Sequence, residues 1–499
     1  MAVQPQFDWG LHGFLYYDGE GNYCRGETFV ADHLAEQVTS YIEWIYQSYN
    51  QAKPYLPEGF DRDRRHPEWT RALLDQLGSP DRTTCNIAVT GSKGKGTHAI
   101  LLAAVLERMG LSVGLFTSPH LVDFLERIRL NGQKISEKDF VRYAQRIRSA
   151  AETLQLPAHH YFGPVGYVAA IAAEFFRDHQ TDVNIFELGR GARHDDVNQI
   201  VHQGALMTPV FLEHKMQLGP ELRDVIWEKI GILTSDTRWW VLHPQPQETG
   251  QILETIRAEL HLPEPIRAQM NQCQLVCRKD NIDEYRVTTS GPIFTIYGPT
   301  VLEAFRSNLV VVMEAAWQIW RMLRPFSEAS LELHIEDLAL PGRMQYLPNL
   351  SVPTLLDGAI HRENARRVLN YLDAIGQLGN KRRGAIVCLP DDKDGEGLLN
   401  ELHEYLDWII FCRAQNPHLQ FSRHWVGVWQ QMGKIGKETH SFASAWQMAL
   451  DHLSVDEIWL LGTQSFLTDV FQYLKIDTGS IWNQPTKQKS DGKSLTAKE

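Results

Sequence analysis

Two kinds of hydrophobic pattern alternate along the chain. Short runs rich in β-branched residues are separated by longer stretches in which apolar residues recur at helical spacing, which is typical of βαβ units that share a parallel sheet. In the first part of the chain the short runs predict strands at Asn86 to Thr90, Val113 to Phe116, Val183 to Leu188, Leu206 to Leu212 and Trp239 to His243. The longer stretches predict helices at Gly96 to Met109, Val165 to Arg177 and Glu221 to Leu233. We therefore expect a fold of the α/β class.

The pattern changes after this first series. Between Asn271 and Tyr297 apolar and polar residues alternate, which predicts antiparallel strands that form either an appendage or the edge of the first sheet. A helix is expected at Asn308 to Met322. A second α/β series then predicts strands at Val352 to Leu356, Ala385 to Leu389, Trp408 to Cys412 and Glu457 to Leu461, with helices at Arg362 to Ile375 and Ser441 to His452. We therefore place a domain boundary near Leu340 and Pro341.

Composition narrows the class of protein. The 499 residues exceed the roughly 100–200 of a single domain, which agrees with two α/β parts. A net charge of −12 argues against nucleic acid or an anionic membrane as the main partner, because affinity for either starts from clustered Lys and Arg. The six cysteines form no CxxC pair, and no apolar run reaches the roughly 18 residues of a membrane span. We therefore expect a cytoplasmic protein with reduced thiols.

The strongest local signal is a glycine-rich turn between a strand and a helix, in NIAVTGSKGKGTHAILLAAVLERMG. Gly91, Gly94 and Gly96 let backbone N–H groups converge on an anion, and the helix N-terminus adds a partial positive charge. Lys95 would meet the terminal phosphates, and the Thr97 hydroxyl can contribute to a Mg²⁺ site. The sequence therefore predicts a nucleoside triphosphate site, with a turn that binds nothing as the structural alternative.

A carboxylate ends a neighbouring strand that is otherwise apolar. Glu187 lies at the carboxyl edge of Val183 to Leu188, where open α/β sheets place their ligands. Its partner is either an arginine that follows it, Arg190 or Arg193, or a metal ion. The nearby phosphate loop favours Mg²⁺, which binds through few carboxylates together with phosphate oxygens.

Several motifs that follow in order carry a resemblance to a known family. With the glycine-rich turn, the segment GLFTSPHLVDFLERIRLNGQKIS at Gly114 to Ser136 closely resembles the folylpolyglutamate synthase and dihydrofolate synthase family of the Mur ligase superfamily. The likeness covers roughly residues 70 to 470. It continues through IFELGRGARHDDVN from Ile185, LEHKMQLGPELRDVIWEKIGI from Leu212, LPGRMQ from Leu340, LLDGA from Leu355, DDKD from Asp391 and LLGTQSF from Leu460.

The resemblance implies an architecture. The implied fold is α/β, with a Mur-ligase-like P-loop ATPase domain on a mainly parallel sheet, followed by a smaller Rossmann-like α/β domain. Residues 61–340 would form the ATP-binding domain and 341–484 the C-terminal ligase domain. Residues 1–60 would be an N-terminal extension that contains Trp9, Tyr16, Tyr17 and Tyr23, and 485–499 would be a disordered tail.

The resemblance also implies an activity. The family forms an amide bond at the expense of ATP, with Mg²⁺, by activating a carboxylate as an acyl phosphate that the amino group of an amino acid then attacks. Its members add glutamate to a folate. The expected partners are therefore a small-molecule carboxylate acceptor and an amino acid, with neither nucleic acid nor a membrane, and the expected state is a monomer.

Individual residues take roles from the motifs that they match. The implied Mg²⁺ ligands are Thr97, Ser118, Glu187 and His214. Lys229 matches a lysine that is carbamylated in the family, although its own surroundings indicate a snorkelling or salt-bridged lysine. Arg343 is implied to stabilise charge on the phosphate, with a salt bridge at the domain linker as the alternative. The implied ATP-binding residues are Gly91, Gly94, Lys95, Gly96, Thr97, Asn308, Arg343 and Asp357, and the implied catalytic residues are Lys95, His214, Lys229 and Arg343.

Some positions depart from the family pattern. An Asp-Gly-Ala-His-Asn segment of the family has Ile360 in place of its histidine, and a glutamine before the ATP-site asparagine is replaced by Phe305. A Phe-Glu pair reads Phe162-Gly163, and Lys93 adds a positive charge inside the phosphate loop. Two alternatives therefore stay open: a Mur-type ligase for a different acid and amine, and a nucleotide-binding regulatory or scaffold protein without ligase activity.

Overall fold

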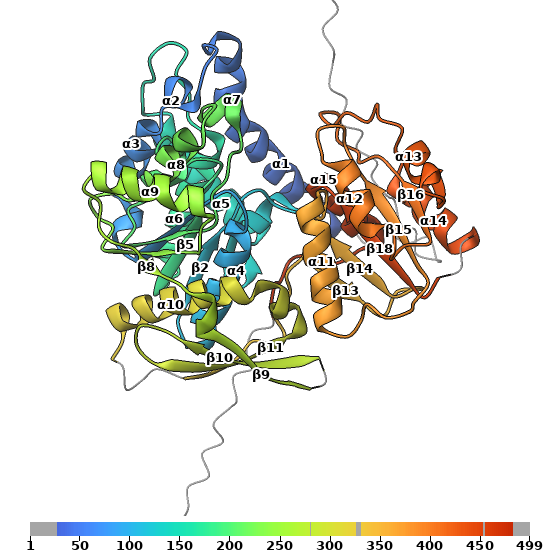
Figure 1. Cartoon of the computed structure of the whole chain (residues 1–499). Helices are drawn as coiled ribbons and strands as arrows, with labels where there is room; N and C mark the ends of the chain where they lie inside the picture. The colour runs from blue at the N-terminus through green and yellow to red at the C-terminus, as the bar shows by residue number, and fades with distance from the viewer. Residues whose placement is uncertain (1–26, 280, 326–330, 453–454, 483–499) are drawn as a thin grey trace, which may run out of the picture.

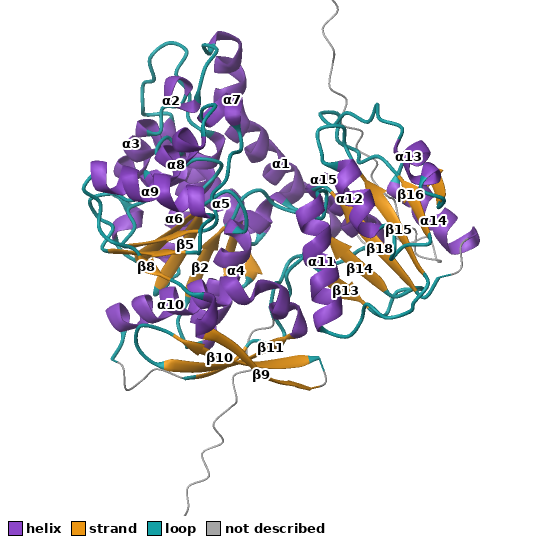
Figure 2. Ribbon diagram, viewed as in Figure 1, coloured by secondary structure: helices purple, strands orange, loops and turns teal. Residues whose placement is uncertain are grey.

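The computed structural model describes residues 27–279, 281–325, 331–452 and 455–482, and it contains three β-sheets (Figure 1). An eight-stranded and a six-stranded sheet carry helices on both faces, and a four-stranded sheet lies at one end of the larger body (Figure 2). We refer to the residues around the eight-stranded sheet as the first part and to those around the six-stranded sheet as the second part. The predicted α/β class is confirmed. Among the described residues, no helix is both long and apolar enough to cross a bilayer.

The eight-stranded sheet has the strand order β4-β3-β2-β5-β1-β6-β7-β8. Parallel pairing joins β2 (Val113–Phe116), β5 (Val183–Glu187), β1 (Cys85–Thr90), β6 (Gly204–Met207), β7 (Trp239–Leu242) and β8 (Ile266–Arg267). Antiparallel pairing adds β3 (Ile128–Leu130) and β4 (Gln133–Lys134) at one edge. The predicted strands are present, but the strand expected to reach Leu212 ends at Met207, because Thr208 bonds to the neighbouring loop and Pro209 has no N–H to donate.

Both faces of this sheet are buried, which explains the nearly continuous apolar runs of its strands. Ala88 and Phe186 face one core, whereas Ile87 and Ile185 face the opposite core. The first core is covered by α1 (Glu27–Ala52), α3 (Glu68–Gln76), α5 (Glu137–Ala151), α6 (Pro164–Asp178), α8 (Leu222–Ile230) and α9 (Gln247–Glu259). The second is covered by α4 (Lys95–Arg108) and α10 (Arg306–Leu323). The short helices α2 (Asp61–Arg64) and α7 (Lys215–Leu218) complete this part.

The four-stranded sheet has the order β12-β11-β10-β9 and does not join the eight-stranded sheet. It comprises β9 (Cys273–Lys279), β10 (Ile282–Thr288), β11 (Ile293–Pro299) and β12 (Glu332–His334). Tyr285, Val287, Phe294 and Ile296 alternate along β10 and β11 and are buried in the core that contains α10. Of the two alternatives for residues 271–297, the appendage is therefore correct.

The six-stranded sheet has the order β13-β14-β18-β15-β16-β17. Its strands are β13 (Gln345–Leu347), β14 (Thr354–Asp357), β15 (Arg383–Cys388), β16 (Trp408–Phe411), β17 (Ile435–Glu438) and β18 (Glu457–Gly462). Its helices are α11 (Arg362–Ala374), α12 (Gly395–Leu402), α13 (Trp425–Gln431), α14 (Phe442–His452) and α15 (Gln464–Leu474). The predicted strands and helices are present, and β13, α12, α13, β17 and α15 were not predicted.

After α15 the chain returns to the first part. The Arg129 guanidinium donates to the carbonyls of Thr478 and Gly479, each at 2.7 Å. Ala339 N–H donates to the Ile481 carbonyl at 2.9 Å, and Trp482 packs in the core of the first part. The linker into the second part and the segment out of it therefore run side by side. The division into domains stays a prediction, and the aromatic residues Trp9, Tyr16, Tyr17 and Tyr23 and the tail at 485–499 lie outside the described residues.

Candidate active site

The glycine-rich turn connects β1 to α4 and has a backbone that only glycine fits. Gly91 has φ +139°, and a Cβ there would lie 1.9 Å from Thr208 Oγ1. Gly94 has φ +86° and is the N-cap of α4. The turn is fixed from behind, since Thr208 Oγ1 donates to the Lys93 carbonyl at 2.8 Å and Ser92 N–H donates to the Pro209 carbonyl at 2.9 Å. The open N–H groups at the start of α4 therefore form a rigid cradle that fits a phosphate.

Two lysine ammonium groups converge on one carbonyl of this turn. Lys95 Nζ donates to the Gly91 carbonyl at 3.0 Å, and Lys229 Nζ donates to the same carbonyl at 2.9 Å. Lys95 is half-buried at the first position of α4, so its amino group can exchange this carbonyl for a phosphate oxygen. The structure therefore brings together the loop and two of the predicted catalytic residues.

Glu187 ends β5 beside the loop and is buried. It accepts hydrogen bonds from the backbone N–H groups of Ser118, at 3.0 Å, and of Gly96. Burial raises the pKa of Glu187 to about 6, with Lys95 opposing the shift. Neither arginine is its partner: Arg190 donates to Asp61 at 2.6 and 2.7 Å, and Arg193 lies over the Trp227 ring.

Within the described residues, Glu187 has no ion pair within 4.0 Å. A buried carboxylate with only backbone donors is poorly compensated and fits a divalent cation as its missing countercharge. Of the other predicted metal ligands, Ser118 contacts Glu187 directly through its backbone, and Thr97 is buried one residue after Gly96. His214 lies further out, half-exposed, with Nε2 3.7 Å from Glu213 Oε2.

Lys229 is completely buried on α8. Its amino group donates to the Arg190 carbonyl at 2.6 Å and forms an ion pair with Glu213 Oε1 at 2.9 Å. Burial lowers the pKa of Lys229 to about 8, and Glu213 opposes the shift. Of the two interpretations drawn from its own surroundings, the salt-bridged lysine is correct and the snorkelling lysine is wrong. Glu213 was not predicted, although it directly precedes His214 in the same motif.

Across from the loop, the second part presents Arg343 and Asp357. Asp357 is buried and accepts from Met344 N–H at 2.9 Å. Burial raises the pKa of Asp357, and Arg343 opposes the shift. Arg343 Nη1 donates to the Gly342 carbonyl at 3.0 Å, and within the described ranges it has no ion pair within 4.0 Å. The linker salt bridge considered for Arg343 is therefore not formed by any residue that the structure describes. The predicted ATP-binding residue Asn308 lies near the start of α10, beside Ser307.

The chain is similar in sequence to proteins of known function. No protein-family model matches it. It is 31% identical over 396 residues to the dihydrofolate synthase/folylpolyglutamate synthase of Mycobacterium tuberculosis, an alignment that covers 74% of this chain and 78% of that protein. It is 27% identical over 391 residues to the protein of the same name from Escherichia coli, covering 77% and 86%. The chain belongs to the folylpolyglutamate synthase and dihydrofolate synthase family.

Solved structures of this family share the fold. The folylpolyglutamate synthase of Mycobacterium tuberculosis complexed with ADP and AMPPCP superposes with a TM-score of 0.70 at 20% identity, covering 87% of this chain and 99% of that one. A bifunctional folylpolyglutamate synthase/dihydrofolate synthase with Mn, AMPPNP and L-glutamate bound gives 0.66 at 22% identity, covering 83% and 95%. The Mur-ligase-type α/β fold is therefore confirmed. A relative from Bos taurus is named as mitochondrial, so a cytoplasmic location stays a prediction.

The structure shows the surroundings of three residues that depart from the family pattern. Gly163 lies under Asp196, and a Cβ at Gly163 would be 2.2 Å from Asp196 Oδ2. Phe305 is buried, with the Arg367 guanidinium 5.6 Å from its ring centre. Ile360 lies next to the N-cap of α11. Gly163 and Phe305 are therefore packed into the fold, whereas Ile360 is only partly buried.

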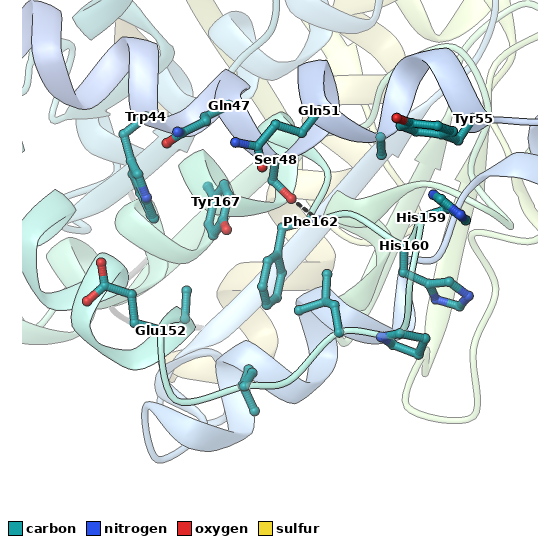
Figure 3. Close-up of a pocket in the computed structure, with 15 residues that line it drawn as sticks. Trp44, Gln47, Ser48, Gln51, Tyr55, Glu152, His159, His160, Phe162 and Tyr167 are labelled. Atoms are coloured by element: carbon teal, nitrogen blue, oxygen red, sulfur yellow. Dashed lines mark hydrogen bonds between the residues drawn. The ribbon is translucent and has the colours of Figure 1, made fainter.

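Two cavities flank the connection at 159–163. The α1 cavity has a volume of about 510 Å³ and lies between α1 and residues 151–167. In Figure 3, Trp44 faces Tyr167 with ring centres 4.5 Å apart, and Ser48 accepts the Phe162 N–H. The tyrosine cavity, about 480 Å³, is lined by Tyr46, Tyr49, Asp61, Arg64, Arg65, Tyr161, Gly163, Pro164, Val165, Arg190, Asp196 and Gln217. Only the tyrosine cavity shares a residue, Arg190, with the surroundings of Lys229.

A cluster beside the α1 cavity has ligand types that suit a metal. The ligand atoms of His66, Glu68 and His160 lie within 4.8 Å of one another. However, Trp69 Nε1 donates to His160 Nδ1 at 3.0 Å, which places the ring proton on the other nitrogen. His66 and His160 are also stacked, with ring centres 3.7 Å apart. We therefore interpret the cluster as structural packing.

Proposed function

We propose that this protein is an ATP-dependent, ADP-forming ligase that joins glutamate to a folate through an acyl phosphate. The observation that carries the proposal is the phosphate cradle beside Glu187, a buried carboxylate for which the described residues supply no cationic side chain in contact. Family membership supplies the chemistry, since the relatives are named as dihydrofolate and folylpolyglutamate synthases. Solved structures that share this fold hold nucleotides, Mn and L-glutamate.

In this proposal the loop binds the phosphates of ATP. The N–H groups from Gly94 to Thr97 and the Lys95 ammonium contact phosphate oxygens, while Arg343 approaches from the second part. Asn308 and Asp357 contact the rest of the nucleotide. No protein nucleophile is needed, because the acceptor carboxylate attacks the terminal phosphate and the amino group of glutamate attacks the resulting acyl phosphate. The work of the protein is therefore positioning and charge stabilisation.

Glu187, Thr97, Ser118 and His214 would hold Mg²⁺. When bound, Mg²⁺ neutralises phosphate charge and orients the terminal phosphate. The buried Glu187 carboxylate fits this role because its donors are backbone N–H groups that leave its negative charge uncompensated. His214, with its half-exposed ring, would supply the outermost ligand.

Lys229 is proposed to carry a carbamate. Its lowered pKa, about 8, leaves a larger fraction of neutral amine at neutral pH, and the neutral amine is the form that adds CO₂. The modification would replace an ammonium by an anion beside Glu213 and so create a second cation site. In the unmodified protein the buried ammonium of Lys229 is compensated by its ion pair with Glu213.

The tyrosine cavity is proposed to hold the acceptor. It offers aromatic faces and the Arg64 guanidinium, which within the described residues has no ion pair within 4.0 Å. We expect Arg64→Ala to raise the KM for the acceptor about tenfold, with a smaller change in kcat, because a carboxylate contact is lost before the chemical step. Steady-state kinetics with varied acceptor measures this. Arg62→Ala, an exposed arginine of the same helix, is the matched control, and equal KM values for both variants would contradict the assignment.

A ligase for a different acid and amine is the second candidate. It is favoured by Gly163, which stands where the family has a glutamate and packs under Asp196. The decisive assay is phosphate release from ATP with glutamate, using tetrahydrofolate or dihydropteroate as acceptor. We expect release that depends on both substrates, with a product one glutamate longer by mass spectrometry. Release only with other acids and amines would favour the second candidate, and no substrate-dependent release would favour a nucleotide-binding protein without ligase activity.

A further inference from the structure

Lys93 lies inside the phosphate loop but points away from it. Its carbonyl is fixed by the Thr208 hydroxyl at 2.8 Å, while its amino group contacts Asn364 Oδ1 on α11 of the second part. Lys95, two residues on, points back to the Gly91 carbonyl of the loop itself. The two lysines of this turn therefore have different partners: Lys93 contacts the second part, whereas Lys95 contacts the loop itself.

The Lys93 amino group lies among charged groups of both signs. Arg343 and Arg367 act on it as like charges, and Asp357 and the exposed Glu363 oppose them. Burial together with these arginines lowers the pKa of Lys93 to about 8. Within the described residues, Asn364 is its sole hydrogen-bond partner, so an ammonium with three donors uses one of them on a neutral amide.

Arg343 connects this group to the metal side of the site. Its guanidinium acts electrostatically on Glu187 in the first part and on Lys93, so it is near both groups. An anion placed there would meet Lys93 from the loop and Arg343 from the second part.

We propose that Lys93 is a catalytic residue that binds the terminal phosphate of the triphosphate, and that Asn364 holds its amino group in place when the second part lies against the loop. The inference rests on the proposed function only in that a nucleoside triphosphate occupies the loop. Lys93 forms no covalent bond. Its amino group has this contact only when a third phosphate is present. Because the same group contacts Asn364, the third phosphate and the position of α11 depend on each other.

Calorimetric binding of AMPPCP and ADP in the presence of Mg²⁺, without acceptor, tests this in the full chain. We expect Lys93→Ala to weaken AMPPCP binding about tenfold or more and ADP binding less than about twofold, because one charge-assisted contact to the terminal phosphate is lost. Asn364→Ala should weaken AMPPCP binding less. The double variant should bind no more weakly than Lys93→Ala alone, since both act through one contact. Lys138→Ala, at an exposed lysine, controls for the change in net charge.

Equal losses for ADP and AMPPCP, or no loss for either, would overturn the role of Lys93, and fully additive losses would overturn the role of Asn364. Circular dichroism and the thermal midpoint of each variant show whether it is folded. Lys95→Ala separates this inference from the proposed function. If Lys95→Ala binds both nucleotides as the wild type does, the nucleotide site itself is wrong; if it loses both while Lys93→Ala does not discriminate, only the present inference fails.

Discussion

Replacing Lys95 by alanine is expected to remove nearly all turnover. The ammonium group lies at the first position of α4, 3.0 Å from the carbonyl of Gly91, where the proposed function places the phosphates in a site fixed by glycine backbone. Removing one such preorganised charge lowers kcat about 10²- to 10³-fold, because its contact with the phosphoryl group strengthens in the transition state. Acceptor-dependent phosphate release measures the loss.

The same substitution leaves the fold intact, since the Lys95 side chain is half-buried and contributes no apolar core. Lys95→Ala should therefore have the thermal midpoint of the wild type. Lys138→Ala is the matched control and should retain full activity. Wild-type turnover by Lys95→Ala would refute the assignment of the phosphate site.

Replacing Glu187 by glutamine is expected to separate activity from stability. Activity should fall about 10²-fold or more, because the variant loses the buried charge that is proposed to hold the divalent cation. The metal-free variant should nevertheless be more stable than the wild type above pH 6. Burial raises the pKa of Glu187 from 4.5 to about 6, so its ionisation is unfavourable in the folded state by about 2 kcal/mol.

The sign of this effect follows from the two pKa values. Because the folded pKa is the higher one, the stability that Glu187 contributes is fully present below pH 4.5 and is lost as the pH rises through about 6. Urea unfolding with a chelator should therefore give equal free energies of unfolding at the acid end and a more stable variant above pH 6. Adding Mg²⁺ should stabilise the wild type and not the variant. A variant that is less stable at every pH would show that Glu187 has a cationic partner in the fold.

Much of the fold could be predicted because periodicity reports burial directly. Alternate residues of the central strands face opposite cores, as Ala88 and Ile87 do. Because both faces are buried, these strands are apolar throughout. The missed helices α3 and α5 bury residues at helical spacing, so their patterns were readable, whereas other missed elements carry weaker patterns. Strand β17 buries only Gly436, and α12 contains two glycines, so neither has the periodicity of a strand or helix. Strand β6 was overextended because an apolar run does not show where Thr208 bonds to the loop.

The site was predictable where one segment carries the chemistry. The close spacing of the glycines already indicated a tight turn before a helix, and Gly91 and Gly94 have the positive φ that such a turn needs. Contacts between distant segments were not predictable. The ion pair of Lys229 with Glu213 and the contact of Lys93 with Asn364 depend on how separate elements pack, which no local pattern records.

The linker into the second part and the segment out of it run side by side, and this limits how the two parts can move. The second part is tethered at both of its ends, and the bond from Ala339 to Ile481 keeps the tethers together. Two adjacent tethers leave a body little freedom to translate and one main line about which to turn. Once the contacts of α15 with the His120 and Leu121 carbonyls release, we therefore expect the second part to move mainly by rotation about this line. A nick at either tether would remove this constraint while leaving both sheets intact.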